Sequence, residues 1–358
     1  MCNHAGSNYF AQPVSFSMYS KFLTFSVFFI FILFLPVAHA EQADRGVGLY
    51  FDQDMFVPFS NEDRDYTMGM AIEFFWSKEK GLYPLDNLVR SAGKWLGMNN
   101  SDNELVYSFM LGSVVYTPDD LSDSSPIFDD RPYSSLIYLS NKRVLTEHRK
   151  ALAAEVSIGL LGSHVAESVQ SQLHTIYRSV SGLNEPVDPQ GWSHQISDGG
   201  ELTMRVRLSG SLLQPDFSRE GRWDLTTSYG LSLGYQTNLN VAAAVRVGNI
   251  KSPFWSLPFD PVNRGNFLPS SPGKEWYLWS AIRSHLVIYD VLLQGQFRNS
   301  DVQFSSDQIE RVVFDGAAGL TVGFEKSQFT FSINAKSADL KFMSRRQVWG
   351  GLNFLLHF

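Results

Sequence analysis

The chain has 358 residues, of which 14% are aromatic and only 18% are charged, and its formal net charge is −7. This acidic balance excludes nucleic acid as a partner, because binding to a phosphate backbone depends on an excess of lysine and arginine. The single cysteine, Cys2, precedes the apolar segment described next, so neither disulfides nor cysteine chemistry are expected in the mature protein.

Residues 18–40 have the three parts of a secretory signal peptide. Lys21 supplies the positive charge, an apolar run follows it, and Ala38-His39-Ala40 is an Ala-x-Ala cleavage site. We therefore predict a signal peptide over residues 1–40, cleaved after Ala40, and one domain over residues 41–358. An uncleaved membrane anchor is the alternative, but the run is short for a bilayer span and leads directly into the cleavage motif.

The rest of the chain predicts a transmembrane antiparallel β-barrel in the Gram-negative outer membrane. No later stretch reaches the roughly 18 apolar residues that a helical span needs, so a second membrane segment would have to be a closed barrel. Both ends of a bacterial barrel lie in the periplasm, which requires an even strand number. Thirteen alternating runs are present, so at least one is not a strand: 46–56, 66–76, 104–116, 134–145, 151–160, 201–212, 223–237, 240–249, 275–286, 287–298, 310–324, 328–338 and 347–358.

Turn-forming and polar segments predict the connections. Thr237-Asn-Leu-Asn240 and the Ser327-Gln328 step are typical of tight periplasmic turns. The long stretches rich in polar residues, proline and glycine are expected to be extracellular loops or rim segments. These stretches are 118–132, 181–200 and 250–274.

The last strand predicts how the barrel is recognised during assembly. Phe354, Leu356 and Phe358 share one face at period two, with Leu355 and His357 on the other. A terminal strand that is apolar outward and ends on an aromatic residue fits an outer-membrane barrel. We expect the barrel-assembly machinery to be a partner through this strand.

One segment breaks the alternation and predicts a short extracellular helix near residues 164–180. Its apolar residues recur at helical spacing and Ser163 is a candidate N-cap. We expect this amphipathic helix to lie over the barrel mouth, where Gln170 and His174, four residues apart, share a face. The apolar positions are Val165, Val169, Leu173, Ile176 and Val180.

The candidate chemical groups lie at the end of the first strand and on this helix. Alternation places Asp52 and Asp54 on one face, and two carboxylates so close together favour a bound cation such as Ca²⁺. If the first two strands pair, Thr67 lies near Asp54. His174 is the best candidate general base. His164, His194 and His285 compete with it on composition, and no histidine spacing indicates a zinc site.

Seven ordered blocks resemble the outer-membrane lipid A deacylases of the LpxR type, over nearly the whole mature chain. Each block alone is a weak signal, and their order makes the resemblance specific. The blocks are Phe51-Asp-Gln-Asp54-Met-Phe56, Asp63-Arg-Asp-Tyr-Thr67-Met-Gly69, Tyr116-Thr-Pro-Asp119, Asp130-Arg-Pro-Tyr133, Gly159-Leu-Leu-Gly162, Gln170-Ser-Gln-Leu-His174 and Gly191-Trp-Ser-His-Gln195.

The resemblance implies a twelve-stranded barrel that hydrolyses an ester of lipid A, the lipid anchor of lipopolysaccharide, with Ca²⁺ as cofactor, and removes the 3′-linked acyloxyacyl group. Its catalytic set, carried over, falls on Gln53, Asp54, Thr67 and His174, with the metal near Asp54. Gln53 stands where the family has asparagine. The family lysine has no counterpart between Thr117 and Arg131, although Arg131 could supply positive charge there.

Two other functions compete with deacylation. A non-catalytic barrel of the same fold, structural or pore-forming, would explain Gln53 and the missing lysine as signs of lost activity. A phospholipase with a serine nucleophile is the third hypothesis, which the absence of a Gly-x-Ser-x-Gly motif disfavours.

Overall fold

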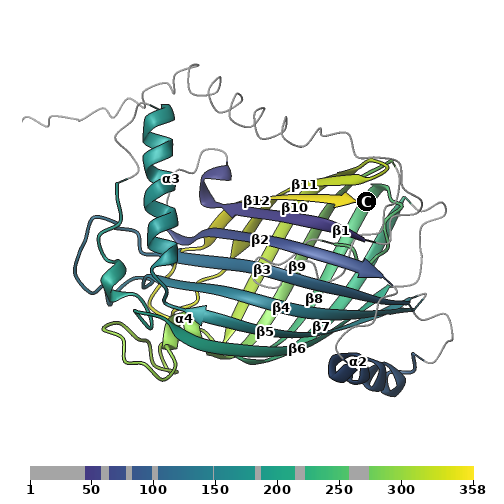
Figure 1. The fold of residues 1–358 in the computed structure, drawn as a ribbon, viewed down its shortest axis with the longest axis horizontal. Coiled ribbons are helices and arrows are strands. Elements are labelled where there is room, and N and C mark those ends of the chain that lie inside the picture. The colour runs from purple at the N-terminus through teal and green to yellow at the C-terminus, as the bar shows by residue number, and fades with distance from the viewer. Residues whose placement is uncertain are drawn as a thin grey trace, which may run out of the picture.

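A computed structural model gives the fold of most of the chain after the predicted signal peptide (Figure 1). The cleavage site after Ala40 lies outside the described residues. The structure describes residues 45–57, 64–77, 83–98, 104–147, 149–181, 187–213, 222–257 and 274–358.

Within these ranges, twelve antiparallel strands form one closed barrel, which confirms the predicted fold class. Each strand pairs with the next along the chain, and β1 closes the barrel on β12, with Gly46 opposite His357 and Gln53 opposite Gly350. Closure pairs the backbone groups that an open sheet edge would leave exposed to lipid. The strands are β1 (Arg45–Gln53), β2 (Asp65–Ser77), β3 (Glu104–Thr117), β4 (Ser134–Glu147), β5 (Lys150–Leu161), β6 (Glu201–Leu213), β7 (Trp223–Gly234), β8 (Gln236–Asn249), β9 (Glu275–Asp290), β10 (Val312–Gly323), β11 (Ser327–Lys336) and β12 (Gln347–His357).

One of the thirteen expected strands, 287–298, is wrong. Val287 to Asp290 continue β9, which is 16 residues long, and the chain then turns into the short helix α4 (Val291–Gln294). The first three residues of α4 are buried, so their apolar character comes from packing in a helical turn. An apolar run of this length does not distinguish a strand from a buried helical turn.

Two expectations about the connections are also wrong. Thr237 to Asn240 lie within β8, and the β7–β8 turn is at Tyr235, where Gly234 has a φ of +128°. Because odd-numbered strands run away from the chain termini, this turn lies at the barrel end of the α3 helix, not at the periplasmic end. The connection between β8 and β9, expected to be an extracellular loop or rim segment, begins at the terminus end instead.

Other connections agree with the sequence. A tight turn joins β10 to β11 at the terminus end, where Phe324 N donates to Ser327 O at 2.7 Å. The stretches 118–132 and 181–200 lie at the opposite end, in their described parts. At the seam, Phe358 N donates to Arg45 O at 3.0 Å, so the terminal residue extends the closing strand. Recognition of this strand by the assembly machinery stays a prediction.

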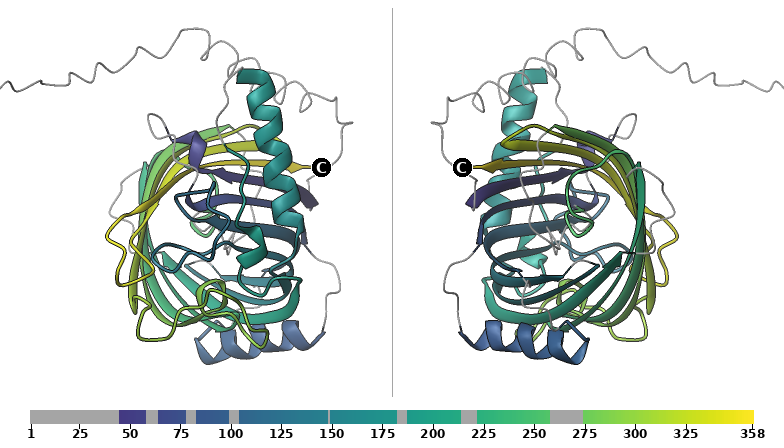
Figure 2. Two further views of the ribbon diagram at one scale, coloured as in Figure 1. Left: turned by 90° about the vertical axis from the view of Figure 1, so that its left-hand side faces the viewer. Right: turned by 90° about the vertical axis from the view of Figure 1, so that its right-hand side faces the viewer.

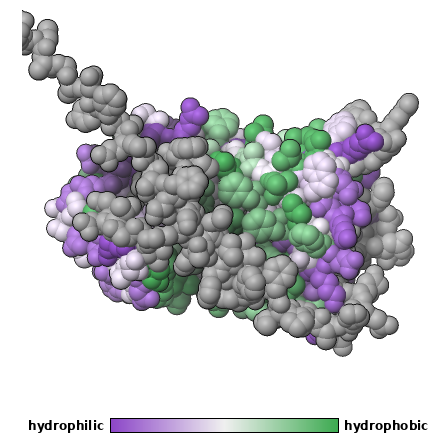
Figure 3. Space-filling view, turned by 90° about the horizontal axis from the view of Figure 1, so that it is seen from above, coloured by the Kyte–Doolittle hydropathy of each residue, from purple (hydrophilic) through white to green (hydrophobic). Residues whose placement is uncertain are grey.

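Side chains alternate between the lumen and the outer surface. In β12, Leu355 and His357 are buried inward, whereas Phe354 and Leu356 are on the outward face, as the sequence predicts. A hydrophobic belt separates two hydrophilic ends in Figure 3. Outward residues with at least two fifths of their surface exposed include Phe74, Leu111, Leu139, Ile158, Met204, Leu233, Val241, Ile282, Leu320 and Phe329.

The lumen holds buried charged pairs at several levels. Glu73 is fully buried and accepts hydrogen bonds from Tyr50 Oη at 2.6 Å and Lys142 Nζ at 3.0 Å. Arg205 Nη2 donates to Glu155 Oε1 at 2.6 Å. Paired in this way, the charges avoid much of the cost of burial. A lumen packed with side chains is unlike the water-filled channel of a porin.

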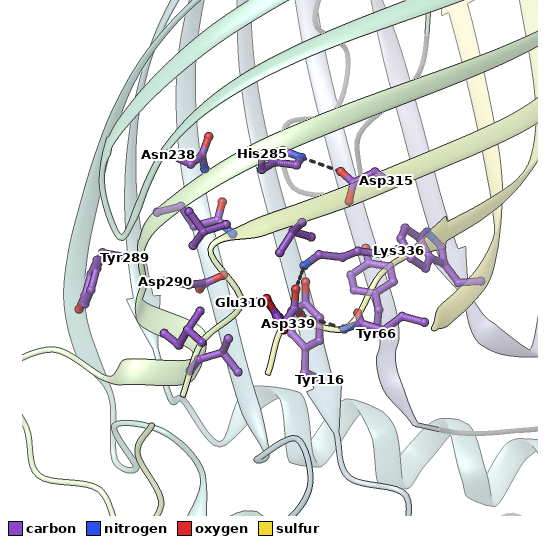
Figure 4. Close-up of a pocket in the computed structure, with 17 residues that line it drawn as sticks. Tyr66, Tyr116, Asn238, His285, Tyr289, Asp290, Glu310, Asp315, Lys336 and Asp339 are labelled. Carbon is purple, nitrogen blue, oxygen red and sulfur yellow. Dashed lines mark hydrogen bonds and ion pairs between the residues drawn. The ribbon is translucent and has the colours of Figure 1, made fainter. Parts of the chain in front are cut away.

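A further polar group lies in the lumen toward the α3 end, lining a cavity that Figure 4 shows. His285 Nε2 lies 2.7 Å from Asp315 Oδ2, and Lys336 Nζ lies 2.7 Å from Asp339 Oδ1. Arg131 also pairs with Asp339. Since Asp339 lies between β11 and β12 and Arg131 between β3 and β4, this pair joins two loops inside the barrel mouth.

Two long helices lie outside the barrel wall. They are α2 (Tyr83–Trp95), near the terminus end, and α3 (Val165–Ser181), at the opposite end (Figures 1 and 2). The helix expected near 164–180 is thus confirmed. Ser163 does not cap it, because its buried Oγ has no hydrogen-bond partner among the described residues. None of the helices in the described ranges is long and apolar enough to cross a membrane.

The loop contact at Asp339 predicts how stability depends on pH. Burial opposes ionisation of Asp339, but Lys336 and Arg131 outweigh it and hold its pKa below the ordinary value of 3.8. A carboxyl with a depressed pKa contributes stability above its unfolded pKa and loses that contribution as pH falls through the folded value. Asp339→Asn should therefore cost on the order of 3 kcal/mol at pH 7, with the difference from wild type narrowing below about pH 4.

Urea unfolding in detergent micelles between pH 3 and 7 measures this difference. Asp129→Asn, at an exposed position of the loop that carries Arg131, is the control and should follow wild type. An Asp339→Asn penalty that stays constant across the whole pH range would contradict the assignment.

Candidate functional site

The candidate site begins where β1 ends, on the outer face of the barrel. Phe51 and Gln53 occupy outward positions, and the chain then makes the 3₁₀ turn η1 (Asp54–Phe56). Phe56 folds back over the outer wall, with its ring centroid 5.3 Å from that of Phe51. Asp54 is therefore placed by a turn that lies on the lipid-facing side.

This placement corrects the expectation that Asp52 and Asp54 share a face. Asp52 points into the lumen, where Tyr66 Oη donates to its Oδ2 at 3.1 Å. Asp54 leaves the strand and accepts from Gln53 Nε2 at 3.3 Å and from the backbone N–H of Arg64 at 3.1 Å. The strand ends at Gln53, three residues before the end of the expected run 46–56, so the two carboxylates have different partners.

A glycine in the neighbouring strand makes room for the turn. Gly350 of β12 is paired with Gln53, and a Cβ at this position would lie 2.4 Å from Phe56 Cβ and 3.1 Å from the Phe56 carbonyl carbon. Any side chain here would push η1 away from the wall. Gly350 thus fixes how closely the segment carrying Asp54 approaches the barrel.

Thr67 reaches the site through a β-bulge in β2. The pairing with β3 shifts between Tyr66 and Met68, so that Thr67 is the extra residue. The bulge lets Tyr66 point into the lumen while Thr67 Oγ1 hydrogen bonds to Thr117 Oγ1 at 2.6 Å. Because Gln53 is paired with Met68, the bulge brings Thr67 beside the start of η1. Bulges of this kind often redirect a side chain next to an active site.

The α3 helix packs against the same outer face, through a set of apolar residues that we call the rim cluster. Ala166, Val169 and Leu173 supply the helix side of this contact. The helix thus crosses the rim on the side of β1 to β3 and projects past the barrel (Figure 2). The wall and loop residues of the rim cluster are Phe51, Met68, Met70, Val115, Leu121, Tyr133 and Trp192.

Gln170 and His174 are both buried on α3, as their spacing predicts for a shared face. Trp192 Nε1 donates to Gln170 Oε1 at 3.1 Å. His174 Nδ1 lies 2.9 Å from the carbonyl oxygen of Val187. A carbonyl can only accept, so this contact assigns the proton to Nδ1 and leaves the lone pair on Nε2, the nitrogen that a general base uses.

The three other candidate histidines lie in different surroundings from His174. His164 is largely exposed and its Nδ1 lies 3.2 Å from Glu167 Oε2. His194 joins two loops, since its Nδ1 lies 2.6 Å from Asp301 Oδ2 and its Nε2 lies 3.1 Å from the Ser124 carbonyl. His285 points into the lumen. Of these histidines, His174 is the buried one, and it lies on the helix that packs in the rim cluster.

Arg131 does not join the candidate site. It is buried in the barrel mouth, with its guanidinium carbon 3.7 Å from the centroid of the Tyr116 ring, and pairs with Asp339. Arg64 lies closer to the site, because its backbone binds Asp54 and its side chain binds Asp119 Oδ1 at 2.8 Å. Arg64 belongs to the sequence block around Thr67, but its residue type alone does not indicate a role beside Asp54.

The donor atoms fit a hard cation at Asp54. Gln53 Oε1 is buried without a hydrogen-bond partner in the described part of the chain, next to the Asp54 carboxylate. Amide and carboxylate oxygens are ligands that Ca²⁺ takes, together with backbone carbonyls and water. In the described residues, no group of three or more His, Cys, Asp or Glu side chains is arranged to hold a metal ion. Protein ligands would therefore include amide or backbone oxygens.

A closed barrel with an apolar outer belt and a polar lumen defines a transmembrane β-barrel of the outer-membrane type. The family model described as outer membrane protein LpxR matches residues 23–358. The chain therefore belongs to the LpxR family of outer membrane proteins.

Structural comparison agrees on the fold. The LpxR structure from Salmonella typhimurium is similar over 87% of this chain and 100% of that one, with 15% identity and a TM-score of 0.67. Two weaker matches have TM-scores below 0.5. The β domain of the Bordetella autotransporter BrkA has 9% identity and a TM-score of 0.40, over 89% of this chain and 100% of that one. An outer membrane channel from Pseudomonas putida F1 has 12% identity and a TM-score of 0.39, over 90% of this chain and 97% of that one. A search of curated proteins found no match.

The packing of η1 on Gly350 predicts a matched pair of glycine variants. Gly350→Ala should displace Phe56 and the Asp54 turn and cost about 1–3 kcal/mol, as overpacking usually does. Gly316→Ala is the control, because its Cβ would meet its nearest heavy atom, Ala281 O, at 3.9 Å. Unfolding in urea compares the two, and equal stability of both variants would show that η1 does not rest on Gly350.

Proposed function

We propose that this protein is a calcium-dependent lipid A 3′-O-deacylase that removes the 3′-linked acyloxyacyl group in the outer leaflet. The observation that carries the proposal is the outward placement of the site. Gln53, η1 and the Thr67 bulge lie on the outer wall, and the helix with His174 packs on that same wall. A lipid embedded in the outer leaflet meets such a site without entering the lumen.

The residues support hydrolysis of an ester by activated water. His174 Nε2 accepts a proton from water as the water oxygen bonds to the acyl carbon. The same proton then returns to the sugar oxygen as the ester C–O bond breaks, which releases the fatty acid and leaves a 3′-hydroxyl. The Val187 carbonyl holds the imidazole in the required tautomer and stabilises it when both nitrogens are protonated.

Asp54 and Gln53 would hold the cation in this scheme. A bound Ca²⁺ supplies positive charge near the ester, which stabilises the negative oxygen of the tetrahedral state. Arg64 fixes Asp54 through its backbone N–H, so the carboxylate stays beside Gln53. Thr67 contributes a hydroxyl at the same rim, tied to Thr117.

The pore-forming alternative has less support from the structure. Charged pairs fill the lumen at the level of Glu73 and Lys142 and again at Arg131 and Asp339. A structural barrel without activity remains the runner-up, since Gln53 is one methylene longer than the family asparagine and Arg131 does not replace the family lysine. The following experiment separates an enzyme from a non-catalytic barrel.

Expression in a host with hexa-acylated lipid A should produce a species without the 3′ acyloxyacyl group, measured by mass spectrometry of lipid A. His174→Gln should restore the parent mass, because loss of a general base typically costs ~10²–10⁴ in rate. His164→Gln, at the exposed start of the same helix, is the matched control and should behave as wild type. Asp54→Asn, and chelation of wild-type protein in an extract, should also prevent deacylation.

Two results would contradict the proposal. An unchanged lipid A profile with well-expressed, calcium-supplied wild type would favour the non-catalytic barrel. A deacylated profile with folded His174→Gln would mean that another residue is the base, and His194 would be the next residue to replace.

A further inference from the structure

The α2 helix lies on the outside of the barrel wall, near the terminus end (Figure 2). Its buried residues Leu85 and Val89 pack against outward positions of three strands. Ala92 and Leu96 extend the same face. The wall side of this contact is Leu105 and Tyr107 of β3, Leu145 of β4, and Leu152 and Ala154 of β5.

Polar contacts fix the helix against the wall. Arg143 Nε donates to Asp86 Oδ1 at 2.7 Å, and Lys150 Nζ donates to the Leu96 carbonyl at 3.0 Å. Gly93 allows the helix to lie close to the wall, because a Cβ at this position would lie 2.6 Å from Leu145 Cδ2. These contacts fix α2 against the barrel wall. The faces of the helix that do not contact the wall therefore have a fixed orientation relative to the barrel.

Those remaining faces combine apolar, aromatic and basic side chains. Trp95 is 86% exposed and Leu88 is 45% exposed, and their spacing of seven residues places both on one flank of the helix. Arg90 and Lys94 are exposed four residues apart, on the side away from the wall. The helix thus presents an exposed apolar flank and an exposed basic side to its surroundings.

The position of α2 identifies the partner. On the strands that carry the helix, the next outward residues toward the α3 end include Phe109 of β3 and Ile158 of β5, 40% and 59% exposed. They are exposed apolar residues on the outer wall, so α2 borders the lipid-facing surface. At this end of the barrel the bordering lipids are those of the periplasmic leaflet. Tryptophan prefers the membrane interface, and lysine and arginine next to it attract lipid phosphates.

We propose that α2 is an interfacial helix that binds phospholipids of the periplasmic leaflet. Trp95 and Leu88 lie at the boundary between headgroups and acyl chains, and Arg90 and Lys94 contact the phosphates. Amphipathic helices with an aromatic flank and basic residues bind membranes in this way. Here the barrel supplies the other apolar face, so the helix is folded before lipid binds.

The first test measures the depth of position 95 in the membrane. Because Cys2 is the only cysteine and precedes the predicted mature start, Trp95→Cys can carry a single environment-sensitive fluorophore. In vesicles of phosphatidylethanolamine and phosphatidylglycerol, the label should emit at short wavelength and be quenched by nitroxide-labelled lipid. Ser125→Cys, exposed in a loop at the opposite end, is the control and should be quenched by aqueous iodide instead.

Quenching of the label at position 95 by iodide and not by lipid nitroxide would overturn the proposal. A disulfide between two copies at position 95 in these vesicles would also overturn it, in favour of a contact between barrels.

The second test addresses the basic residues. Wild-type protein should unfold at a higher temperature in phosphatidylglycerol vesicles than in phosphatidylcholine vesicles, and Arg90→Gln with Lys94→Gln should remove most of that increment. Lys341→Gln with Arg346→Gln, at the other end of the barrel, is the charge-matched control and should keep it. An equal increment in wild type and the α2 double variant would exclude phosphate binding by these residues.

Discussion

The closed barrel imposes one constraint on which the rest of the structure depends: each strand residue points either into the lumen or toward lipid. Residues that must meet a membrane lipid therefore have to occupy outward positions or leave the strand. Gln53 occupies an outward position, and Asp54 leaves the strand by entering a turn that folds over the outer wall. Thr67 reaches the site through a bulge that interrupts the alternation of β2. The rim cluster then packs α3 against the same outer face of the barrel.

The lumen and the outer wall have separate roles in this arrangement. Inside, charged pairs such as Glu73 with Lys142 are fully buried and stabilise the barrel as a packed body. Arg131 belongs to this interior set, where it joins the mouth loops through Asp339. Outside, the helices α3 and α2 each cover part of the wall at opposite ends of the hydrophobic belt. In the proposed function, α3 serves the outer leaflet, whereas the separate inference about α2 assigns it to the periplasmic leaflet.

Much of the fold could be predicted from period-two alternation, because the belt and the lumen select opposite residue types on every strand. The helix with His174 was predictable for the same reason, as its apolar spacing departs from period two. The run 287–298 was misread because α4 is as apolar as a strand and too short to show its own period. The turn at Tyr235 was missed because one glycine with positive φ replaces the polar residues that usually mark a turn.

The sequence motifs name the candidate site residues, but they do not predict the local geometry around them. The quoted motifs contain Gln53, Asp54, Thr67 and His174, but neither the end of β1 at Gln53 nor the bulge at Thr67 has a local sequence signal. Both depend on pairing with residues far along the chain, as Gly350 shows by making space for η1. The direction of Arg131 likewise depends on Asp339, 208 residues away.

The central claim is that Asp54 on the wall and His174 on α3 act in one hydrolytic site. A double-mutant cycle on purified, refolded protein tests this most directly, with kcat/KM for lipid A deacylation measured for Asp54→Asn, His174→Gln and the double variant. Residues that act as a unit give non-additive losses, so the double variant should lose about as much activity as the more impaired single variant. A loss of kcat/KM in the double variant equal to the product of the two single losses would contradict the account. Single variants that retain the wild-type kcat/KM would also contradict it.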